Sequence, residues 1–266
     1  MLHLVALAAT ALLLPHATVE RSHMRVAHRA TGCRACADAP GDTEEPASTA
    51  ASAPNLESEL MRVAASTNRG ATRSDDAARS VDDLIAKLES SGSPDVSSGA
   101  LDGSWSLAYA TCPAYRSSPF FSGFGQLAGQ LASPLYAITD RMPFYKVGAA
   151  RQTLTGTSST DGMGTLVSAI EVDLVAFDAS LRSVMTTSAS VRPDSEDAST
   201  LILELQTTEV KDSALPLSGM LTFPTARVFD GLKSGSASVR LRTSYLSDTM
   251  RITRAPDGAV LVYVPE

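Results

Sequence analysis

Histidine, the side chain that most often moves protons in enzymes, occurs in this chain only near the N-terminus. The four histidines are His3, His16, His23 and His28. They lie in a stretch that we expect to be removed as a targeting segment, so the mature chain would have no histidine. That excludes histidine-based acid–base catalysis, histidine-ligated metals and Ser-His-Asp or Cys-His nucleophiles.

The cysteines and the acidic pairs do not replace that chemistry. Cys33 and Cys36 form a C-x-x-C motif in the same N-terminal stretch, without the second pair or folded histidines that a zinc or redox site needs. Cys112 stands alone and is expected to be a small buried or half-buried thiol. Acidic pairs such as Asp75-Asp76 fall on expected solvated faces. The sequence therefore predicts binding and not catalysis, with no metal and no cofactor. The alternative is an enzyme that uses carboxylates alone, which would need paired acids inside the fold.

The overall composition fits a folded protein whose partners are not nucleic acids. The chain has 266 residues, 44% of them hydrophobic, which is enough for one large domain or two small ones. Its formal net charge of −7 lacks the basic surface that nucleic acids require. The composition leaves the oligomeric state open.

The N-terminal stretch reads as two successive targeting signals. Residues 1–17 are almost wholly apolar but too short to cross a membrane comfortably, which is typical of a signal peptide. Residues 18–54 begin with an arginine-rich and acid-poor part, typical of a transit peptide, and continue as a disordered linker. A signal peptide followed by a transit peptide predicts a plastid bounded by extra membranes. Plain secretion with a basic propeptide is the alternative.

Residues 55–92 have the apolar spacing of two short helices. In the first helix Asn55 is a candidate N-cap, and Leu56 and Leu60 begin one apolar face. Gly70 is expected to end the turn after it. Ser74 is a candidate N-cap of the second helix, whose apolar face comprises Val81, Leu84, Ile85 and Leu88. We expect both helices to bury one stripe against the sheet that follows.

Residues 101–266 alternate in the manner of an antiparallel β-protein. A first strand places Trp105, Leu107 and Tyr109 on one face, and three short C-terminal segments end the chain, the last two joined by the turn Pro256-Asp257-Gly258. Four further strands are predicted over Val147–Gly156, Gly164–Val175, Leu181–Val191 and Thr200–Val210. About eight strands with edges to hide favour a closed or nearly closed barrel, which forms one folded unit with the helical pair. A barrel of this size has room for side chains or for one small ligand.

Two apolar segments interrupt the strands. Ser117–Ser133 carries no charge and has phenylalanine and leucine at helical spacing, so it is either a lid or membrane-surface contact or a helix that plugs the barrel. Ser213–Phe229 reads as an apolar loop over the barrel opening or packed on it. With the first strand, these segments supply the candidate ligand contacts: Trp105, Tyr109, Phe120, Phe124, Leu127, Leu217 and Phe223.

Four ordered motifs resemble the plastid-lipid-associated protein family, also called fibrillins. The first strand, Leu101–Thr111 (LDGSWSLAYAT), is similar to the family's Leu-x-Gly-x-Trp-x-Leu-x-Tyr motif, and Thr243–Arg254 (TSYLSDTMRITR) is similar to its C-terminal signature. Thr67–Gly70 and Gln152–Leu154 match in the helical pair and in the next strand. The resemblance covers about residues 56–265. It implies a lipocalin-like barrel and plastid residence at thylakoids or plastoglobules. It also implies a non-enzymatic role in binding isoprenoids, carotenoids, quinones or acyl lipids. The alternative is a scaffold or coat of lipid bodies or thylakoid complexes, with a barrel filled by its own side chains.

The step Gly103-x-Trp105 is also similar to lipocalins, in which a tryptophan of the first strand packs under an arginine of the last strands. Guanidinium on indole is a cation–π contact worth roughly 0.5–2 kcal/mol. Arg251 and Arg254 are the candidates, and being three residues apart they face opposite ways. We favour Arg254 because it shares a strand face with the apolar Ile252. We expect this contact to close the barrel and not to touch a ligand.

Overall fold

The computed structural model describes residues 52–91, 94–140, 145–158, 163–176, 179–211 and 222–266. The predicted signal peptide, the transit-like stretch and the candidate contact Leu217 lie outside the described residues. Residues Ser52–Glu266 form one compact unit. The helices are α2 (Ala53–Ser66), α3 (Asp75–Glu89), α4 (Pro119–Ala128), α5 (Ala132–Asp140) and α6 (Thr225–Leu232), with 3₁₀ turns η1 (Val96–Ser98), η2 (Ala114–Ser117) and η3 (Gly129–Leu131). The strands are β1 (Gly103–Ala110), β2 (Tyr145–Thr155), β3 (Gly164–Ala176), β4 (Ala179–Pro193), β5 (Thr200–Lys211), β6 (Thr222–Phe223), β7 (Ser238–Leu246), β8 (Arg251–Arg254) and β9 (Val260–Pro265).

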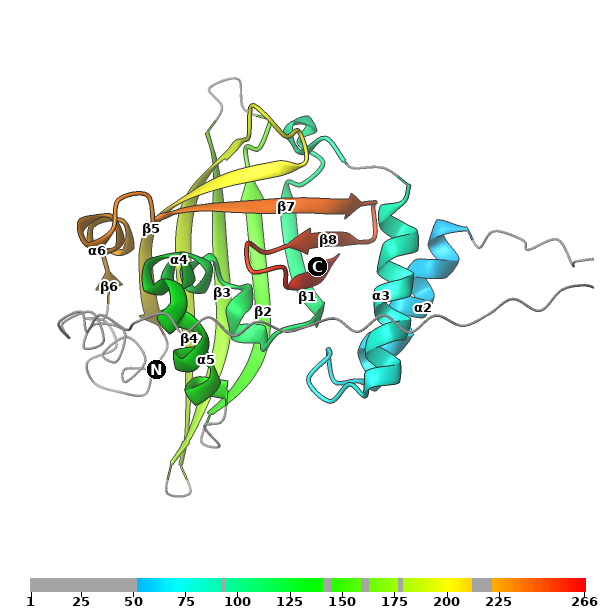
Figure 1. Ribbon diagram of the computed structural model, residues 1–266, viewed down its shortest axis with the longest axis horizontal. Coiled ribbons are helices and arrows are strands. Elements are labelled where there is room, and N and C mark those ends of the chain that lie inside the picture. Colours follow the sequence, from blue (N-terminus) through cyan, green and yellow to red (C-terminus); the bar gives the residue numbers. More distant parts are fainter. Residues whose placement is uncertain (1–51, 92–93, 141–144, 159–162, 177–178, 212–221) are drawn as a thin grey trace, which may run out of the picture. The chain divides into compact units, whose positions relative to one another are not determined.

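The strands close into an antiparallel barrel of eight strands, as the alternation predicted (Figure 1). The order around the sheet is β4-β3-β2-β1-β9-β8-β7-β5, and β5 also pairs with β4, so the ring has no open edge. The two-residue β6 pairs with β5 at Thr208 and Glu209, beyond the part of β5 that pairs with β7. Full closure satisfies the backbone groups that would be unpaired at an open edge. Among the described elements, no helix is long and apolar enough to cross a membrane.

The two N-terminal helices form as expected, with one correction at the first cap. The helix α2 begins at Ala53, with Ser52 at its N-cap position, so the prediction of Asn55 was wrong. Pro54 explains the shift, because proline fits the first turn of a helix, where its missing N–H is not needed. The cap of α3 is the predicted Ser74, whose hydroxyl accepts a hydrogen bond from the backbone N–H of Ala77. Gly70 follows α2 with φ of +90°, and a Cβ there would lie 2.3 Å from a backbone oxygen of β1.

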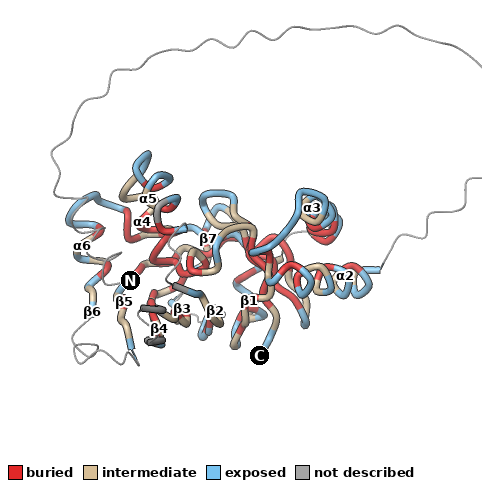
Figure 2. The backbone as a smooth tube through the Cα atoms, turned by 90° about the horizontal axis from the view of Figure 1, so that it is seen from below, coloured by how far each residue is buried: buried red, intermediate tan, exposed pale blue. Residues whose placement is uncertain are grey.

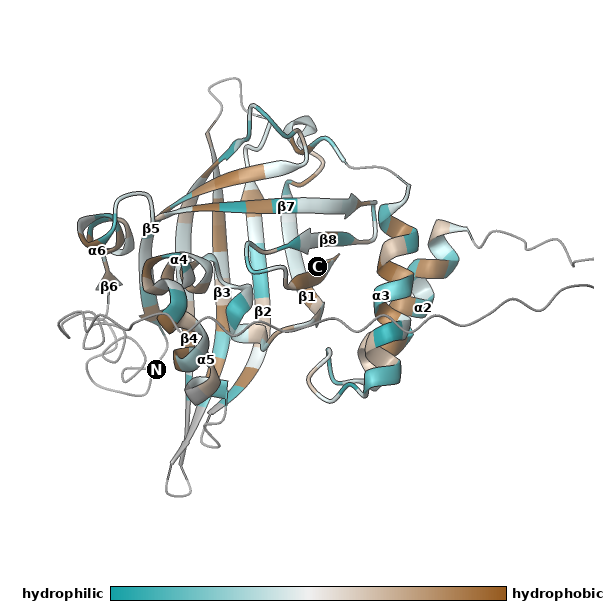
Figure 3. Cartoon of the chain, viewed as in Figure 1, coloured by the Kyte–Doolittle hydropathy of each residue, from teal (hydrophilic) through white to brown (hydrophobic). Residues whose placement is uncertain are grey.

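The helical pair seals part of the outer wall of the barrel. In Figures 2 and 3 both helices bury one side and carry apolar residues between polar ones. The buried apolar cluster on that side joins the pair to β1, β7, β8 and β9, and it comprises Leu56, Leu60, Ala64, Val81, Leu84, Ile85, Leu88, Tyr109, Tyr245, Met250, Ile252, Val260 and Val262. Burial of this many side chains is the main stabilising term of the contact.

Two carboxylates of the helical pair form hydrogen bonds with side chains of the barrel. Glu57 of α2 accepts hydrogen bonds from Tyr245 Oη (2.6 Å), Ser247 Oγ (2.8 Å) and Thr249 Oγ1 (2.5 Å). Glu89 of α3 accepts two bonds of 2.8 Å from the guanidinium of Arg254. Both carboxylates therefore bind side chains at or near the ends of β7 and β8, and they hold the helices in register with the strands.

Candidate functional site

A polar belt crosses the inside of the barrel. Gln152, Ser168, Thr187 and Thr208 lie at adjacent register positions on β2, β3, β4 and β5, and all four are buried. The Thr187 hydroxyl bonds to that of Thr208 (3.2 Å) and accepts from Ser118 Oγ (3.1 Å), which belongs to the N-cap of α4. At this level the barrel is therefore filled by its own side chains and by the start of α4.

The tryptophan brace is present, but its arginine is Arg251. The guanidinium of Arg251 lies 5.0 Å from the Trp105 ring centroid and 4.3 Å from that of Tyr263, and it donates to Gln152 Oε1 (2.7 Å). Gln152 and Arg251 lie on β2 and β8, which are three strands apart in the sheet, or about 14 Å at ordinary strand spacing. The bond between them therefore crosses the barrel interior. Burial lowers the pKa of Arg251 to about 10, while Tyr263 acts to raise it, so the side chain stays charged at neutral pH.

The preference for Arg254 was wrong because the apolar face of β8 is the outer face. Arg254 does share that face with Ile252, as predicted, but the helical pair covers it, and Arg254 binds Glu89. Tyr109 is also on the outer side. The register of β1 against β9 shifts between Leu107 and Tyr109, so Tyr109 joins the helical-pair cluster instead of facing inward with Trp105. Trp105 itself donates its indole N–H to the carbonyl of Leu101 (2.9 Å).

The charge-free segment after η2 folds as the helix that its spacing predicted. Phe120 is buried, and its ring centroid lies 5.4 Å from that of Phe229 and 6.1 Å from that of Phe223. The helix α4 packs against α6, β5 and β7. Two of the predicted ligand contacts, Phe120 and Phe223, are thus brought together. They pack against each other, and neither lines the pocket described next. Leu127 is half-buried near the end of α4.

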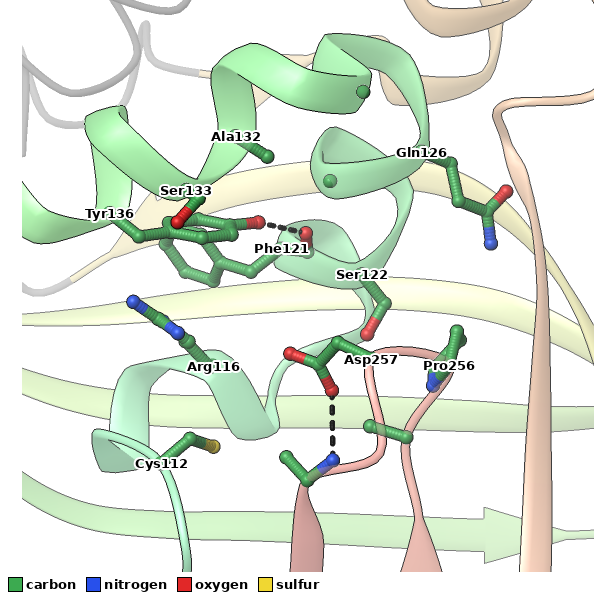
Figure 4. A pocket seen from close by; sticks show the side chains of 14 residues that line it. Cys112, Arg116, Phe121, Ser122, Gln126, Ala132, Ser133, Tyr136, Pro256 and Asp257 are labelled. Carbon is green, nitrogen blue, oxygen red and sulfur yellow. Dashed lines mark hydrogen bonds between the residues drawn. The ribbon is translucent and has the colours of Figure 1, made fainter. Parts of the chain in front are cut away.

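A pocket of about 460 Å³ lies beside α4, between η2, η3, α5 and the turn after β8 (Figure 4). Its lining consists mostly of small or apolar residues with a few polar side chains: Cys112, Arg116, Phe121, Ser122, Gly125, Gln126, Gly129, Ala132, Ser133, Tyr136, Ala255, Pro256, Asp257 and Ala259. None of the predicted ligand contacts is among them. The two glycines and three alanines leave volume that larger side chains would fill.

A polar cluster holds α5 over this pocket. The Arg116 guanidinium lies 4.1 Å from the Tyr136 ring centroid and forms an ion pair with Asp140 (2.7 Å). The hydroxyl of Tyr115 donates to Asp140 (2.7 Å), and that of Tyr136 donates to the carbonyl of Phe121 (2.5 Å). The helix α5 is therefore attached to η2 by polar contacts. It is attached to α4 by the hydrogen bond of Tyr136 and by edge contacts of the Tyr136 ring with Phe121 and Phe124.

The opposite wall of the pocket is the turn Pro256-Asp257-Gly258, which forms as predicted. Gly258 has φ of +85°, and Asp257 Oδ1 accepts from the backbone N–H of Ala259 (3.1 Å). Burial, with a smaller contribution from the charge of Asp257, raises the pKa of Cys112 to about 12. A thiol with such a pKa is not a nucleophile at neutral pH. Among the described residues, no group of three potential metal ligands gathers.

A second pocket, of about 480 Å³, opens at the start of β1 beside the turn after β7. Asp95, Asp102 and Asp248 line it with Trp105. Asp102 is already bonded to Thr157 and to the backbone N–H of Gly156, and Asp95 caps η1. These two carboxylates serve local structure, so we place the candidate site at the first pocket.

Sequence reasoning missed the residues of that pocket because they come from distant segments. Arg116 and Asp257 are 141 positions apart in the chain and meet only through the closed barrel. The available signals were the glycines within the charge-free segment and an acidic residue in the turn between the last two strands.

Two comparisons with known proteins complete the description. The family model PAP_fibrillin matches residues 54–264. A search of curated proteins finds no match.

Proposed function

Because the chain belongs to the PAP/fibrillin family, we propose that it is a non-enzymatic plastid protein that binds an apolar lipid in the pocket between α4, α5 and the β8–β9 turn. The observation that carries this proposal is the pocket itself. Its volume of about 460 Å³ exceeds the roughly 300 Å³ at which small-molecule sites begin, and its walls are largely apolar. The lumen is a weaker candidate, because the polar belt and Arg251 occupy it.

The ligand classes are those that the family resemblance implies, isoprenoids such as carotenoids and quinones, or acyl lipids. The proposed location is a thylakoid or plastoglobule surface, reached through a signal peptide and a transit peptide. Leu131 supports contact with such a surface. It is 60% exposed and lies between the pocket residues Gly129 and Ala132, in a segment without charge. A lipid could pass from the surface into the pocket along this rim.

A scaffold or coat role without bound ligand is the second candidate, and the filled lumen favours it. The hydroxyls of Ser118, Thr187, Thr208 and Thr225 bond to one another, and Arg251 is held between two aromatic rings. A barrel packed in this way is a rigid body that needs no ligand to fold. The two candidates differ in whether the outer pocket is occupied.

Substitution of Gly125 tests the proposal. Gly125 lines the pocket, so the leucine of Gly125→Leu would enter it. Its Cβ would lie 3.3 Å from the Tyr136 hydroxyl, which must shift slightly. We expect it to weaken binding of a neutral fluorescent apolar probe, N-phenyl-1-naphthylamine, by about tenfold. Gly231→Leu is the matched control, because Gly231 is an exposed glycine of α6 with open space around its Cβ position.

The outcomes separate the candidates. Loss of binding in Gly125→Leu alone, with unchanged melting temperature, supports the pocket. Equal binding by the wild type and both variants would move the site elsewhere. If purified native protein carries no extractable lipid and no lipid shifts its melting temperature, the carrier role fails and the scaffold role remains.

A further inference from the structure

The positive charge at the pocket is already paired with a carboxylate. The guanidinium of Arg116 forms an ion pair with Asp140 (2.7 Å), and Arg116 Nε donates to the hydroxyl of Tyr115 (3.3 Å). The ring of Tyr136 lies under the guanidinium at 4.1 Å. Arg116 is therefore committed to holding α5. If Arg116 bound an anionic ligand, its contacts with Asp140, Tyr115 and Tyr136 would weaken.

The carboxylate of Asp257 is the charge that remains among the described lining residues. One of its oxygens accepts from the N–H of Ala259, and Figure 4 shows the other turned toward the side of the pocket where Arg116 and Tyr136 lie. Ser122 also lines this pocket. The pocket therefore offers a negatively charged acceptor in Asp257.

Groups in the pocket that could become anions sense this charge. Burial raises the pKa of the Tyr136 hydroxyl. Among the charges, Arg116 lowers this pKa, and Asp257, with a smaller effect, raises it. The pKa of the Cys112 thiol is raised in the same way. A carboxylate or phosphate carried into this space by a lipid would meet the same loss of solvation and the same repulsion.

We infer that this pocket selects neutral amphiphiles with a hydroxyl head group over lipids with an anionic head group, with Asp257 as the residue that sets the preference. The hydroxyl donates to the free oxygen of Asp257, and the apolar part lies along the wall of Gly125, Gly129 and Ala132. This inference rests on the proposed function, since it requires that the pocket takes up a lipid.

A matched pair of probes tests the preference at neutral pH. Dodecanol and dodecanoate have the same chain and differ in the charge of the head group, and each is titrated against bound N-phenyl-1-naphthylamine. We expect the wild type to bind dodecanol about tenfold more tightly than dodecanoate, and Asp257→Asn to reduce this ratio to about unity. Asparagine still accepts from the N–H of Ala259, so the turn keeps its bond. Asp248→Asn is the control, because it removes the same charge from an exposed turn outside this pocket.

Each outcome decides the matter. A preference for dodecanol that disappears in Asp257→Asn and persists in Asp248→Asn supports the inference. Equal or tighter binding of dodecanoate by the wild type overturns it and leaves lipid binding intact. A ratio that Asp257→Asn does not change overturns the role of this residue. If the wild type binds none of the three probes, the proposed function fails together with the inference.

Discussion

Two pairs of helices cover the barrel, and they pack against it with different side chains. The pair α2–α3 uses leucine, isoleucine and valine at helical spacing and buries them against β1, β7, β8 and β9. The second cover has Gly125 in α4, Gly129 in the connecting η3 and Ala132 in α5, and beside these small residues lies the pocket of about 460 Å³. Side-chain volume along the covering helix therefore decides whether a cover seals the wall or leaves a site.

The polar contacts of the two covers differ in a corresponding way. Around α2–α3 the carboxylates Glu57 and Glu89 fasten a contact that is already closed by apolar packing. Around α5 the attachment combines the polar cluster of Arg116, Tyr136 and Asp140 with the packing of the Tyr136 ring on α4. The first cover should therefore respond strongly to loss of apolar volume, and the second to loss of a polar contact.

Truncation of a leucine in each cover gives the largest contrast. Leu60 of α2 is fully buried, so Leu60→Ala should lower the free energy of unfolding by about 3 kcal/mol through lost burial and a cavity. Leu127 of α4 is half-buried, and Leu127→Ala should cost about 1 kcal/mol. Urea denaturation of both variants measures the difference. Equal losses would contradict the distinction between a sealed and an open cover.

Most of this architecture follows from sequence periodicity, and the departures have local causes. The alternation of apolar and polar residues located the strands, because one face of each strand is buried. The need to pair the edge strands predicted that the sheet closes into a barrel. Periodicity does not say which face is inside, however. On β8 the apolar face with Ile252 is covered from outside by helices, and the charged Arg251 is inside, so the apolar pattern pointed to the wrong arginine.

Single-residue irregularities account for the other errors. A register shift after Leu107 moved Tyr109 to the outer wall, and Pro54 moved the start of the first helix. The candidate site was beyond the reach of pattern reasoning, because a pocket is the space left between elements. The glycines of α4 indicated a flexible segment. Only the fold brings Asp257 to the same pocket as Gly125.

Acidification should loosen the sealed cover, with a smaller effect than truncation. Burial raises the pKa of Glu57, but hydrogen bonds from Thr249, Tyr245 and Ser247 outweigh it and lower the pKa below the ordinary 4.5. The stabilisation is therefore fully present above about pH 4.5 and is lost as pH falls through the lower folded-state pKa. Glu57→Gln should cost about 1 kcal/mol at neutral pH, because hydrogen bonds to a charged acceptor are replaced by weaker ones.

The pH dependence of unfolding distinguishes this clamp from general acid denaturation. Below pH 4.5 the wild type should lose stability more steeply than Glu57→Gln, which has no proton to bind at this position. Burial raises the pKa of Glu89, but Arg254 outweighs it and lowers this pKa. Glu89 is present in both proteins, so its contribution to the loss of stability in acid is the same in both. Parallel curves for wild type and variant would show that the hydroxyls around Glu57 do not stabilise its charge.

Removal of the Asp140 charge should have the smallest effect on stability and the most local one. The side chains of Arg116 and Asp140 are 19% and 29% exposed, so their ion pair is better shielded from water than the pair Arg79–Asp76 on α3, at 75% and 90%. Asp140→Asn should cost about 0.5 kcal/mol, and Asp76→Asn should be within error of zero. Because Arg116 and Asp140 attach α5, amide hydrogen exchange in α5 should accelerate severalfold in Asp140→Asn alone. Unchanged exchange there would mean that the Tyr136 hydroxyl and ring hold α5 without the ion pair.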